Sequence, residues 1–421
     1  MKSNVLRVVL GLFFVAGMLF YVQRILIPYQ QRDATAHDRP RGNLSDLYPR
    51  WLGARELLLN GRDPYSSEVT KEIQAGYYGR PLDPSRPGDP TDQQGFAYPV
   101  YVVFLLAPTI SLPFSFVQEA SFWLLLALST VAALMWLLLL NWRPSRSAIA
   151  LILMLTASSF PVVQGVKLQQ LTLLVAAMIA IAAALVSRDY LIPAGVLMAV
   201  ATIKPQLAVP VGGWFLLWAW SDWHSRKRFA LSFVTAGVAL VAASEWVLPG
   251  WIPRFRDALR AYQAYTGNIG SIVDSLTGHF AGTLLSVAII LVVFLLCWKA
   301  RKAPATSGSF SWTTCLVLTA TIVIIPTIAP YNQVLLIPAV LYAAQHWPQV
   351  AKASLGNRAV SYFGVVIVAW PWIGACALML LSLAVPPTQV QQLWGAPLVS
   401  SLFIPIVVLL MHTLGGKYSV R

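Results

Sequence analysis

The sequence has very little charge, and this deficit excludes most soluble proteins. Only 11% of its 421 residues are charged, whereas 57% are hydrophobic and the mean hydropathy is +0.66. Soluble globular domains carry about 25% charged residues. Runs such as residues 123–140 also lack the alternating polar residues of membrane barrel strands. The sequence therefore predicts an all-α, polytopic integral membrane protein with a single domain, residues 1–421.

Cysteine is also scarce, which leaves few ways to build a metal site or a redox site. The three cysteines, Cys297, Cys315 and Cys376, lie in or beside apolar runs at spacings that match no metal or redox motif. Free cysteine in such a setting behaves as a small packing residue. We therefore expect no metal and no cofactor.

Long apolar runs are what the sequence has instead. The first, residues 5–27, is long enough to cross a bilayer and no small-residue cleavage site ends it, so we expect a retained span rather than a signal peptide. The other apolar segments are residues 118–141, 147–162, 170–187, 191–203, 206–220, 229–247, 279–298, 311–325, 332–344, 360–383 and 397–414. Several are shorter than the roughly 20 residues that a bilayer needs. These short segments come in pairs, joined by polar tips at residues 164–170, 204–206 and 329–333.

Each pair of short segments is either two separate spans or one long broken helix, and the positions of the basic residues distinguish these alternatives. Half of the 30 Lys and Arg residues fall on the side opposite the tips, beside only Asp189 and Asp222, whereas the other acidic residues fall on the tip side. Because positive loops face the cytoplasm, each pair must cross twice. This predicts about 12 spans with both termini cytoplasmic, a transmembrane core in residues 118–344 and further spans in residues 345–421.

The same charge asymmetry accounts for the isoelectric point near 9.9. Nucleic-acid binding is another common cause of a basic composition. No basic patch here is interleaved with aromatic residues away from the membrane ends, however. We therefore expect membrane lipids, and no nucleic acid, among the partners.

A large polar loop, residues 28–117, follows the first span and is expected to be extracytoplasmic. Residues 43–65 predict a helix that Ser45 or Asp46 caps and that Gly61 ends. One interpretation of Asp46 is purely structural: its side chain caps this helix and takes no part in function.

Two other parts of this loop differ in composition. Residues 79–95 are rich in Pro and Gly and predict a flexible segment. Residues 98–116 are apolar but contain three prolines, and a crossing there would place the basic loops on the wrong side. We expect a re-entrant or interfacial helix, packed against the outer face of the bundle.

Polar side chains gather at the three tips, on the same predicted side as Asp46. They are Lys167, Gln169 and Gln170, then Lys204 and Gln206, then Tyr331, Asn332 and Gln333. A lysine at a helix centre in lipid costs about 2.5–3.5 kcal/mol, so it indicates a function unless its ammonium extends to the headgroups. A carboxylate that faces cations and amides fits an anionic, lipid-linked substrate.

Several short motifs resemble one enzyme family. The most specific spans residues 46–48 (Asp-Leu-Tyr), 53–55 (Gly-Ala-Arg) and 57–65 (Leu-Leu-Leu-Asn-Gly-Arg-Asp-Pro-Tyr). Weaker motifs lie at residues 96–99 (Phe-Ala-Tyr-Pro), 165–170, 194–196 and 203–206 (Ile-Lys-Pro-Gln). Over roughly residues 40–340, this pattern resembles the family 87 glycosyltransferases. Where that family often has a Trp and His pair, this chain has Ala-Pro-Tyr-Asn-Gln at residues 329–333.

The resemblance implies a C-type glycosyltransferase fold in the cell membrane, with an extracytoplasmic active site. Such enzymes move a sugar, typically mannose, from a polyprenyl-phosphate donor to a glycolipid or glycan acceptor. Asp46 matches the family's general base, and direct displacement would invert the anomeric centre. Lys204 is the first candidate for binding the donor phosphate, followed by Arg55, Arg62 and Lys167. Candidate substrate-lining residues are Tyr98, Gln169, Gln206, Tyr331, Asn332 and His279.

Two alternative functions remain: a transporter, and a non-catalytic scaffold for envelope assembly, against which the clustered polar tips argue. A secondary transporter or flippase of lipid-linked or polar solutes would also have about 12 spans. That class usually shows internal repeats, and none is visible between the halves of this chain. His279 is a lone histidine at the end of a predicted span, and such a residue is more often interfacial than catalytic. Asp63, before Pro64, is expected to be a turn residue rather than a metal ligand.

Overall fold

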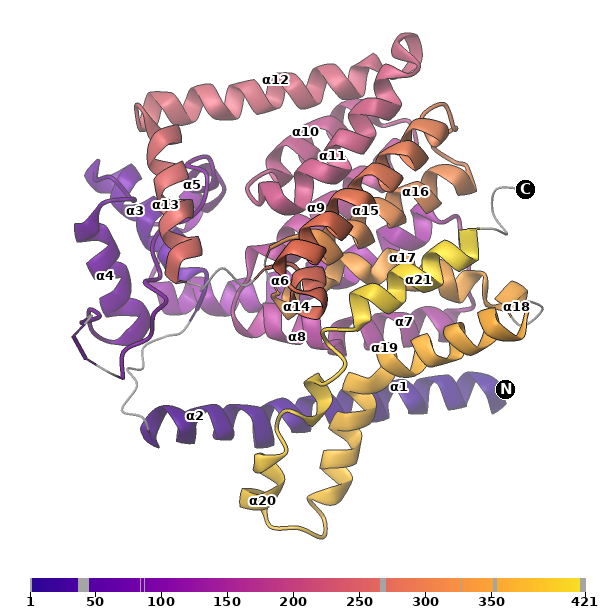
Figure 1. The fold of residues 1–421 in the computed structure, drawn as a ribbon. Helices are drawn as coiled ribbons and strands as arrows, with labels where there is room; N and C mark the ends of the chain where they lie inside the picture. The colour runs from indigo at the N-terminus through magenta and orange to yellow at the C-terminus, as the bar shows by residue number, and fades with distance from the viewer. Residues whose placement is uncertain are drawn as a thin grey trace.

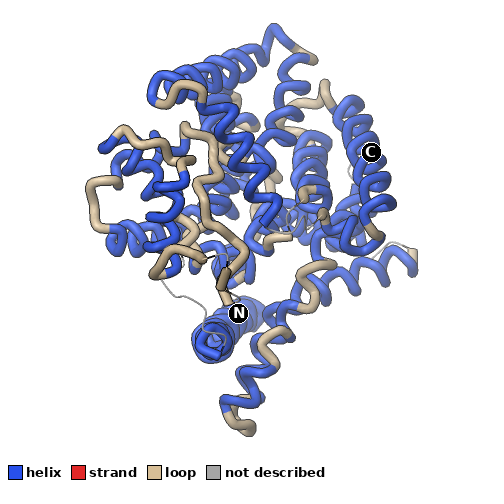
Figure 2. Tube along the Cα trace, turned by 60° about the vertical axis from the view of Figure 1, so that its left-hand side comes forward, coloured by secondary structure: helices blue, strands red, loops and turns tan. Residues whose placement is uncertain are grey.

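The computed structural model describes residues 2–36, 45–83, 85–86, 88–265, 270–326, 328–350 and 354–416. Every regular element among them is helical and none is a strand, which confirms the predicted all-α class (Figures 1 and 2). In Figure 1, α12 (Trp223–Val247) lies along the upper edge, and α1 (Lys2–Phe20) lies in the lower part, above α20 (Pro387–Gln392).

Five helices are long and apolar enough to cross a membrane. They are the continuous helix Asn4–Ala36, α6 (Phe114–Leu139), α12, α15 (His279–Ala300) and α19 (Leu355–Leu381). A sixth candidate is the pair α7 (Arg146–Ser158) and α8 (Phe160–Lys167), which bends by 50°. A membrane protein is therefore supported, whereas the count of 12 spans stays a prediction.

Four shorter apolar helices pack against the longer ones. These are α9 (Leu171–Val186), α10 (Leu191–Ala201), α11 (Pro205–Trp220) and α16 (Gly308–Ile324). Small residues allow α9 to approach its neighbours closely, since Ala177, Ala180 and Ala183 are fully buried. Helix α10 approaches α12 even more closely, because a Cβ on Gly195 would lie 2.5 Å from the backbone oxygen of Phe229. By contrast, α12 and α15 expose apolar side chains over most of their surface, as lipid-facing helices do.

The basic ends of the helices lie together, opposite the polar tips. Arg226, at the start of α12, donates hydrogen bonds to the carbonyl oxygens of Trp218 and Arg301. Ser221 also donates to the Arg301 carbonyl. Because α11 runs from the second tip to Ser221, this end is separated from the tips by the length of the helix. The charge pattern predicted this segregation, and which end faces the cytoplasm stays a prediction.

The first loop contains three short helices, α3 (Tyr48–Asn60), α4 (Ser67–Tyr78) and α5 (Val102–Leu106), at the left of Figure 1. Gly61 ends α3 in the left-handed conformation, with a φ of 64°, as predicted. The predicted cap is wrong, because Leu47 occupies the N-cap position and no side chain bonds to the first turn. Residues 37–44, which include the start of the predicted helix 43–65, lie outside the described residues.

The apolar segment 98–116 forms no span. It contains α5, the 3₁₀ turn η2 (Ala107–Thr109) and the first residues of α6, and α5 packs against α3 with Val102 and Val103 fully buried. Its placement at the membrane surface stays a prediction. Residues 79–95 form no helix where they are described, and a hydrogen bond from Tyr78 to the Asp92 carbonyl ties them to α4.

One helix beside the first loop had no counterpart in the sequence analysis. Helix α13 (Trp251–Tyr265) continues from α12 and descends in front of α3 and α5 in Figure 1. Trp251 is buried with its ring centroid 6.0 Å from that of Tyr101. Arg254 forms a 2.9 Å ion pair with Asp63. The remaining elements are η1 (Tyr21–Leu26), α2 (Ile27–Ala36), α14 (Ile272–Thr277), η3 (Pro330–Leu336), α17 (Ile337–Gln345), α18 (Trp347–Val350), α20 (Pro387–Gln392), η4 (Ala396–Leu398) and α21 (Ile404–Gly416).

Candidate functional site

Asp46 lies just before α3, where the first loop meets the first polar tip. Its backbone N–H donates to the carbonyl oxygen of Leu168 at 2.8 Å, which ties the loop to the tip. One carboxylate oxygen accepts a 3.1 Å hydrogen bond from the hydroxyl of Tyr77, and the other accepts from the side-chain amide of Gln170. The Asp46 carboxylate is therefore held by tertiary contacts and caps no helix.

Lys204 lies on the far side of the same glutamine. It occupies the turn between α10 and α11 and exposes 6% of its surface. Its ammonium donates a 3.0 Å hydrogen bond to the side-chain oxygen of Gln170. The ammonium also donates a 2.5 Å hydrogen bond to the hydroxyl of Thr172. That hydroxyl in turn donates a 3.1 Å hydrogen bond to the side-chain oxygen of Asn332. Residues of all three tips thus meet Asp46 in one hydrogen-bonded cluster, so the prediction that they share one end of the bundle is confirmed.

Two tyrosines flank the ammonium of Lys204. Its Nζ lies 5.8 Å from the ring centroid of Tyr98 and 5.2 Å from that of Tyr331. An aromatic face attracts a cation at such distances. Burial raises the pKa of Tyr98 to about 12 and raises the pKa of Tyr77 as well, so both phenols are neutral near pH 7. Tyr77 can therefore donate a hydrogen bond to the Asp46 carboxylate while it stays neutral.

Arg50 is the most important site residue that the sequence analysis missed. It lies one helical turn after Asp46 and exposes 9% of its surface. Its guanidinium donates a 2.7 Å hydrogen bond to the Asp46 backbone oxygen. Its guanidinium carbon lies 4.6 Å from the Tyr98 ring centroid. The signal was an arginine four positions after Asp46 on a largely apolar helix. Tyr77 and Thr172 were also missed, because neither carries a signal in the sequence.

Three predicted phosphate-binding residues lie apart from this cluster. Arg55 stacks over the Trp51 ring at 5.4 Å. Arg62 forms ion pairs with Glu56 at 2.9 Å and Glu72 at 2.7 Å. Lys167, at the first tip, donates a 2.6 Å hydrogen bond to the side-chain oxygen of Gln30.

Some predicted substrate-lining residues also point elsewhere. Gln169 is buried, and its amide donates to the carbonyls of Val166 and Lys167 rather than to the cluster. Gln206 is exposed at the start of α11. His279 is exposed at the start of α15, with its Nδ1 3.9 Å from an oxygen of Asp274.

Asp63 is a turn residue, as predicted. Its carboxylate accepts a 2.9 Å hydrogen bond from the backbone N–H of Tyr65 and pairs with Arg254. Across the part of the chain that the structure describes, no three His, Cys, Asp or Glu side chains are grouped so as to hold a metal ion.

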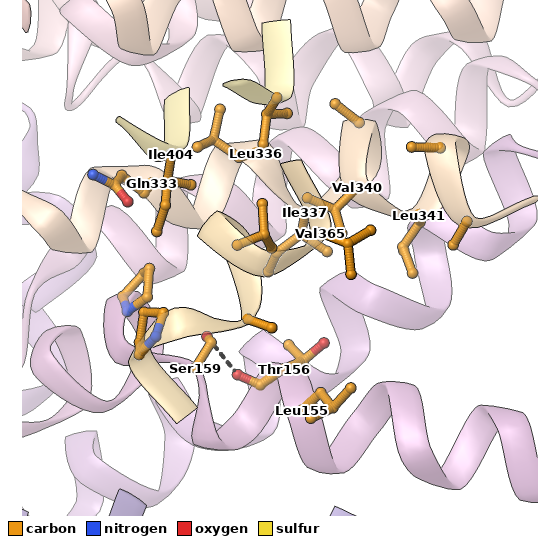
Figure 3. Close-up of a pocket in the computed structure, with 18 of the residues that line it drawn as sticks. Leu155, Thr156, Ser159, Gln333, Leu336, Ile337, Val340, Leu341, Val365 and Ile404 are labelled. Atoms are coloured by element: carbon orange, nitrogen blue, oxygen red, sulfur yellow. Dashed lines mark hydrogen bonds between the residues drawn. The ribbon is translucent and has the colours of Figure 1, made fainter. Parts of the chain in front are cut away.

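An apolar cavity of about 590 Å³ lies beside the polar cluster. Helices α7, α8, α17, α19 and α21 line it, together with η3. The two sites are joined through η3, because Tyr331 and Asn332 belong to the polar cluster while Gln333 and Leu336 line the cavity. Figure 3 shows Gln333 at one edge of the cavity and Ile337, Val340 and Leu341 along it.

Comparison with known proteins agrees with this arrangement. The model of glycosyltransferase family 87 matches residues 96–326, which is more than half of the chain and includes the second tip, Tyr98 and Gln170. No curated protein and no solved structure gave a match. The apolar helices, the buried polar cluster and this match together show that the chain belongs to glycosyltransferase family 87.

Proposed function

We propose that this membrane glycosyltransferase moves a sugar, mannose, from a polyprenyl-phosphate donor to a glycolipid or glycan acceptor outside the cytoplasm. The observation that carries the proposal is the position of Asp46. Its carboxylate is separated from the buried ammonium of Lys204 by a single glutamine side chain. A base and a cation held this close suit a reaction in which one group loses a proton while another gains negative charge.

Four residues of the cluster have a role in this reaction. Asp46 accepts the proton of the acceptor hydroxyl as its oxygen bonds to the anomeric carbon. The bond between that carbon and the phosphate oxygen breaks, its electron pair stays with the phosphate, and Lys204 offsets the new charge. Attack from the face opposite the phosphate inverts the anomeric centre. Gln170 and Tyr77 hold the carboxylate in place, so that little reorganisation precedes the proton transfer.

The apolar cavity supports a lipid-linked donor. Its lining is almost wholly hydrophobic, and it meets the polar cluster along η3. A phosphate at Lys204 with its chain in this cavity would match each part of the donor to a surface of like polarity. Membership in the family also disfavours the transporter alternative.

The donor class can be tested directly. Purified protein incubated with radiolabelled polyprenyl-phosphate mannose and a membrane lipid extract should transfer label to a glycolipid or glycan fraction. A nucleotide-sugar donor should give none. Transfer from the nucleotide sugar would overturn the proposed donor class. Absence of transfer from polyprenyl-phosphate sugars would overturn it as well.

A bulky side chain placed in the apolar cavity should selectively weaken the binding of donors with long lipid chains. We expect Val340→Trp to raise the KM for a long-chain polyprenyl-phosphate mannose at least tenfold, because the indole occupies part of the cavity. A donor with two isoprene units should be affected less than twofold. The control is Val238→Trp, on the exposed surface of α12, where Val238 is 63% exposed. Equal effects on both donors would show that the chain binds elsewhere.

The proposed orientation predicts which turns impermeant reagents reach from outside. Cysteines are introduced singly in a variant that lacks Cys297, Cys315 and Cys376. We expect an impermeant maleimide to label Gly165→Cys, Pro205→Cys and Pro330→Cys in intact cells. It should label Arg146→Cys, Arg226→Cys and Lys302→Cys only after permeabilisation, because positive loops face the cytoplasm. Labelling at Lys302 in intact cells, where the native side chain is exposed, would reverse the orientation.

A further inference from the structure

Arg50 is a buried cation without an ion pair. It exposes 9% of its surface, and its guanidinium forms no ion pair with a carboxylate of any described residue. The Nη1 group donates to the Asp46 backbone oxygen, whereas the buried Nε–H has no hydrogen-bond partner. Buried charges and buried donors are normally paired, because leaving either unpaired costs free energy.

Other arginines at this end of the molecule follow that rule. Arg62 pairs with Glu56 and Glu72, Arg80 with Asp89, and Arg254 with Asp63. All three are more exposed than Arg50, yet each has a carboxylate partner. Carboxylates are therefore plentiful here, yet the most buried guanidinium at this end lacks an ion pair among the described residues, as do the more exposed Arg55 and Arg86.

The nearest carboxylates are already engaged. Asp92 is close enough to act on Arg50 electrostatically, but its oxygens accept from the backbone and side-chain N–H groups of Gln94. The side chain of Asp46 is bonded to Tyr77 and Gln170. Neither carboxylate forms an ion pair with Arg50 or with Lys204.

Arg50 and Lys204 approach the same aromatic ring. They lie 4.6 Å and 5.8 Å from the ring centroid of Tyr98, and no carboxylate ion pair is present at either cation among the described residues. Two like charges brought together in a buried site repel each other, and an anion bound by both would remove that repulsion. A guanidinium with an unpartnered N–H is well suited to phosphate oxygens, to which it donates charge-assisted hydrogen bonds.

We propose that Arg50 and Lys204 bind one phosphate group between them at Tyr98, with Arg50 donating its unpartnered Nε–H. This inference rests on the proposed function, because it takes the phosphate to be that of the polyprenyl-phosphate donor. Arg50 is then a substrate-binding residue of this chain, beside its structural contact with the Asp46 backbone. It holds the same phosphate in the product, after the sugar has left.

The product provides a binding test in which no chemistry occurs. Melting temperatures of the purified full chain are measured with polyprenyl phosphate, with the matching polyprenol and with inorganic phosphate. For the wild type we expect polyprenyl phosphate to raise the melting temperature clearly more than polyprenol does. Arg50→Gln should weaken polyprenyl-phosphate binding at least tenfold and leave polyprenol binding unchanged. Arg50→Lys, which keeps the charge but loses the guanidinium, should be intermediate and serves if Arg50→Gln does not fold.

A matched control separates this role from stability. Arg226 is equally buried, at 9% exposure, but lies at the opposite end of the bundle with hydrogen bonds to backbone carbonyls. We expect Arg226→Gln to lower the melting temperature while preserving the extra stabilisation by polyprenyl phosphate.

The outcomes distinguish the two proposals. If polyprenyl phosphate stabilises the wild type, Arg50→Gln and Arg50→Lys equally, Arg50 does not bind the phosphate and the proposed function stands. If polyprenyl phosphate stabilises the wild type no more than polyprenol, the proposed donor class fails. If inorganic phosphate alone gives the full effect of the lipid phosphate, the site binds free phosphate rather than the donor headgroup, which overturns the inference.

Discussion

Asp46→Asn is expected to reduce sugar transfer about 100-fold or more while the protein remains folded. An amide cannot accept the proton of the acceptor hydroxyl, and general-base catalysis contributes about 10²–10⁴ in rate. The substitution keeps the shape of the side chain. Its oxygen can accept from Gln170, and the hydroxyl of Tyr77 can rotate to accept from the new amide, so the hydrogen bonds of the cluster can be re-formed. The melting temperature should therefore change little.

Melting and sugar transfer are to be measured on the same detergent-purified sample. Asp63→Asn is the control, because Asp63 lies in the same loop but forms a turn and an ion pair with Arg254 outside the cluster. Its transfer rate should stay within about twofold of the wild type. Substantial transfer by Asp46→Asn would exclude Asp46 as the base, and a loss in Asp63→Asn instead would assign that role to Asp63.

Lys204→Met is expected to raise the KM for the donor at least tenfold, about 1.4 kcal/mol, because it removes a buried charge opposite the phosphate. Methionine matches the length of lysine and suits an apolar setting. Thr172 keeps its bond to Asn332, so the fold should survive. Lys71→Met, on the exposed surface of α4, is the control for a lost positive charge. Unchanged donor kinetics in Lys204→Met would mean that its ammonium has only a structural role.

The same lysine predicts a pH dependence. Burial, with a smaller contribution from the charge of Arg50, lowers the pKa of Lys204 to about 7. The protonated form binds phosphate, so donor affinity should be full below pH 7 and fall as the pH rises above it. In Lys204→Arg, whose guanidinium stays charged, the affinity should be flat up to about pH 9. A donor KM that does not vary between pH 6 and 9 in the wild type would contradict this assignment.

The sequence predicted the polar tips and their shared end because charge and hydropathy are read along the chain. The prolines between residues 98 and 116 likewise indicated a segment that does not cross. The number of spans is harder to predict, since α9 and α16 are shorter than a bilayer needs and are buried almost throughout by neighbouring helices. Small residues such as Ala177 allow that packing, but hydropathy alone does not distinguish it from lipid contact.

The site could be predicted only in part, for a different reason. Asp46 has the sequence features of a helix cap, and only the approach of Gln170 from 124 positions away shows that its carboxylate is used elsewhere. Arg50 and Arg62 lie on or beside the same helix, and the partners available to each decide their environments. Arg62 lies near Glu56 and Glu72, whereas α3 turns Arg50 into the protein, beside Tyr98. No local pattern specifies that rotation.

The hydrogen-bonded cluster also sets an order of events during biosynthesis. Gln170 is synthesised 124 positions after Asp46, and Asn332 is synthesised 160 positions after Thr172. Because a chain is made from its N-terminus, the first loop is complete long before the tips that hold its carboxylate. A chain stalled before η3 would already contain Asp46 and Lys204 but would lack the tip that supplies Asn332 and Tyr331. Enzymatic activity should therefore begin only after η3 is in place, which makes it a measure of assembly at least as far as this segment.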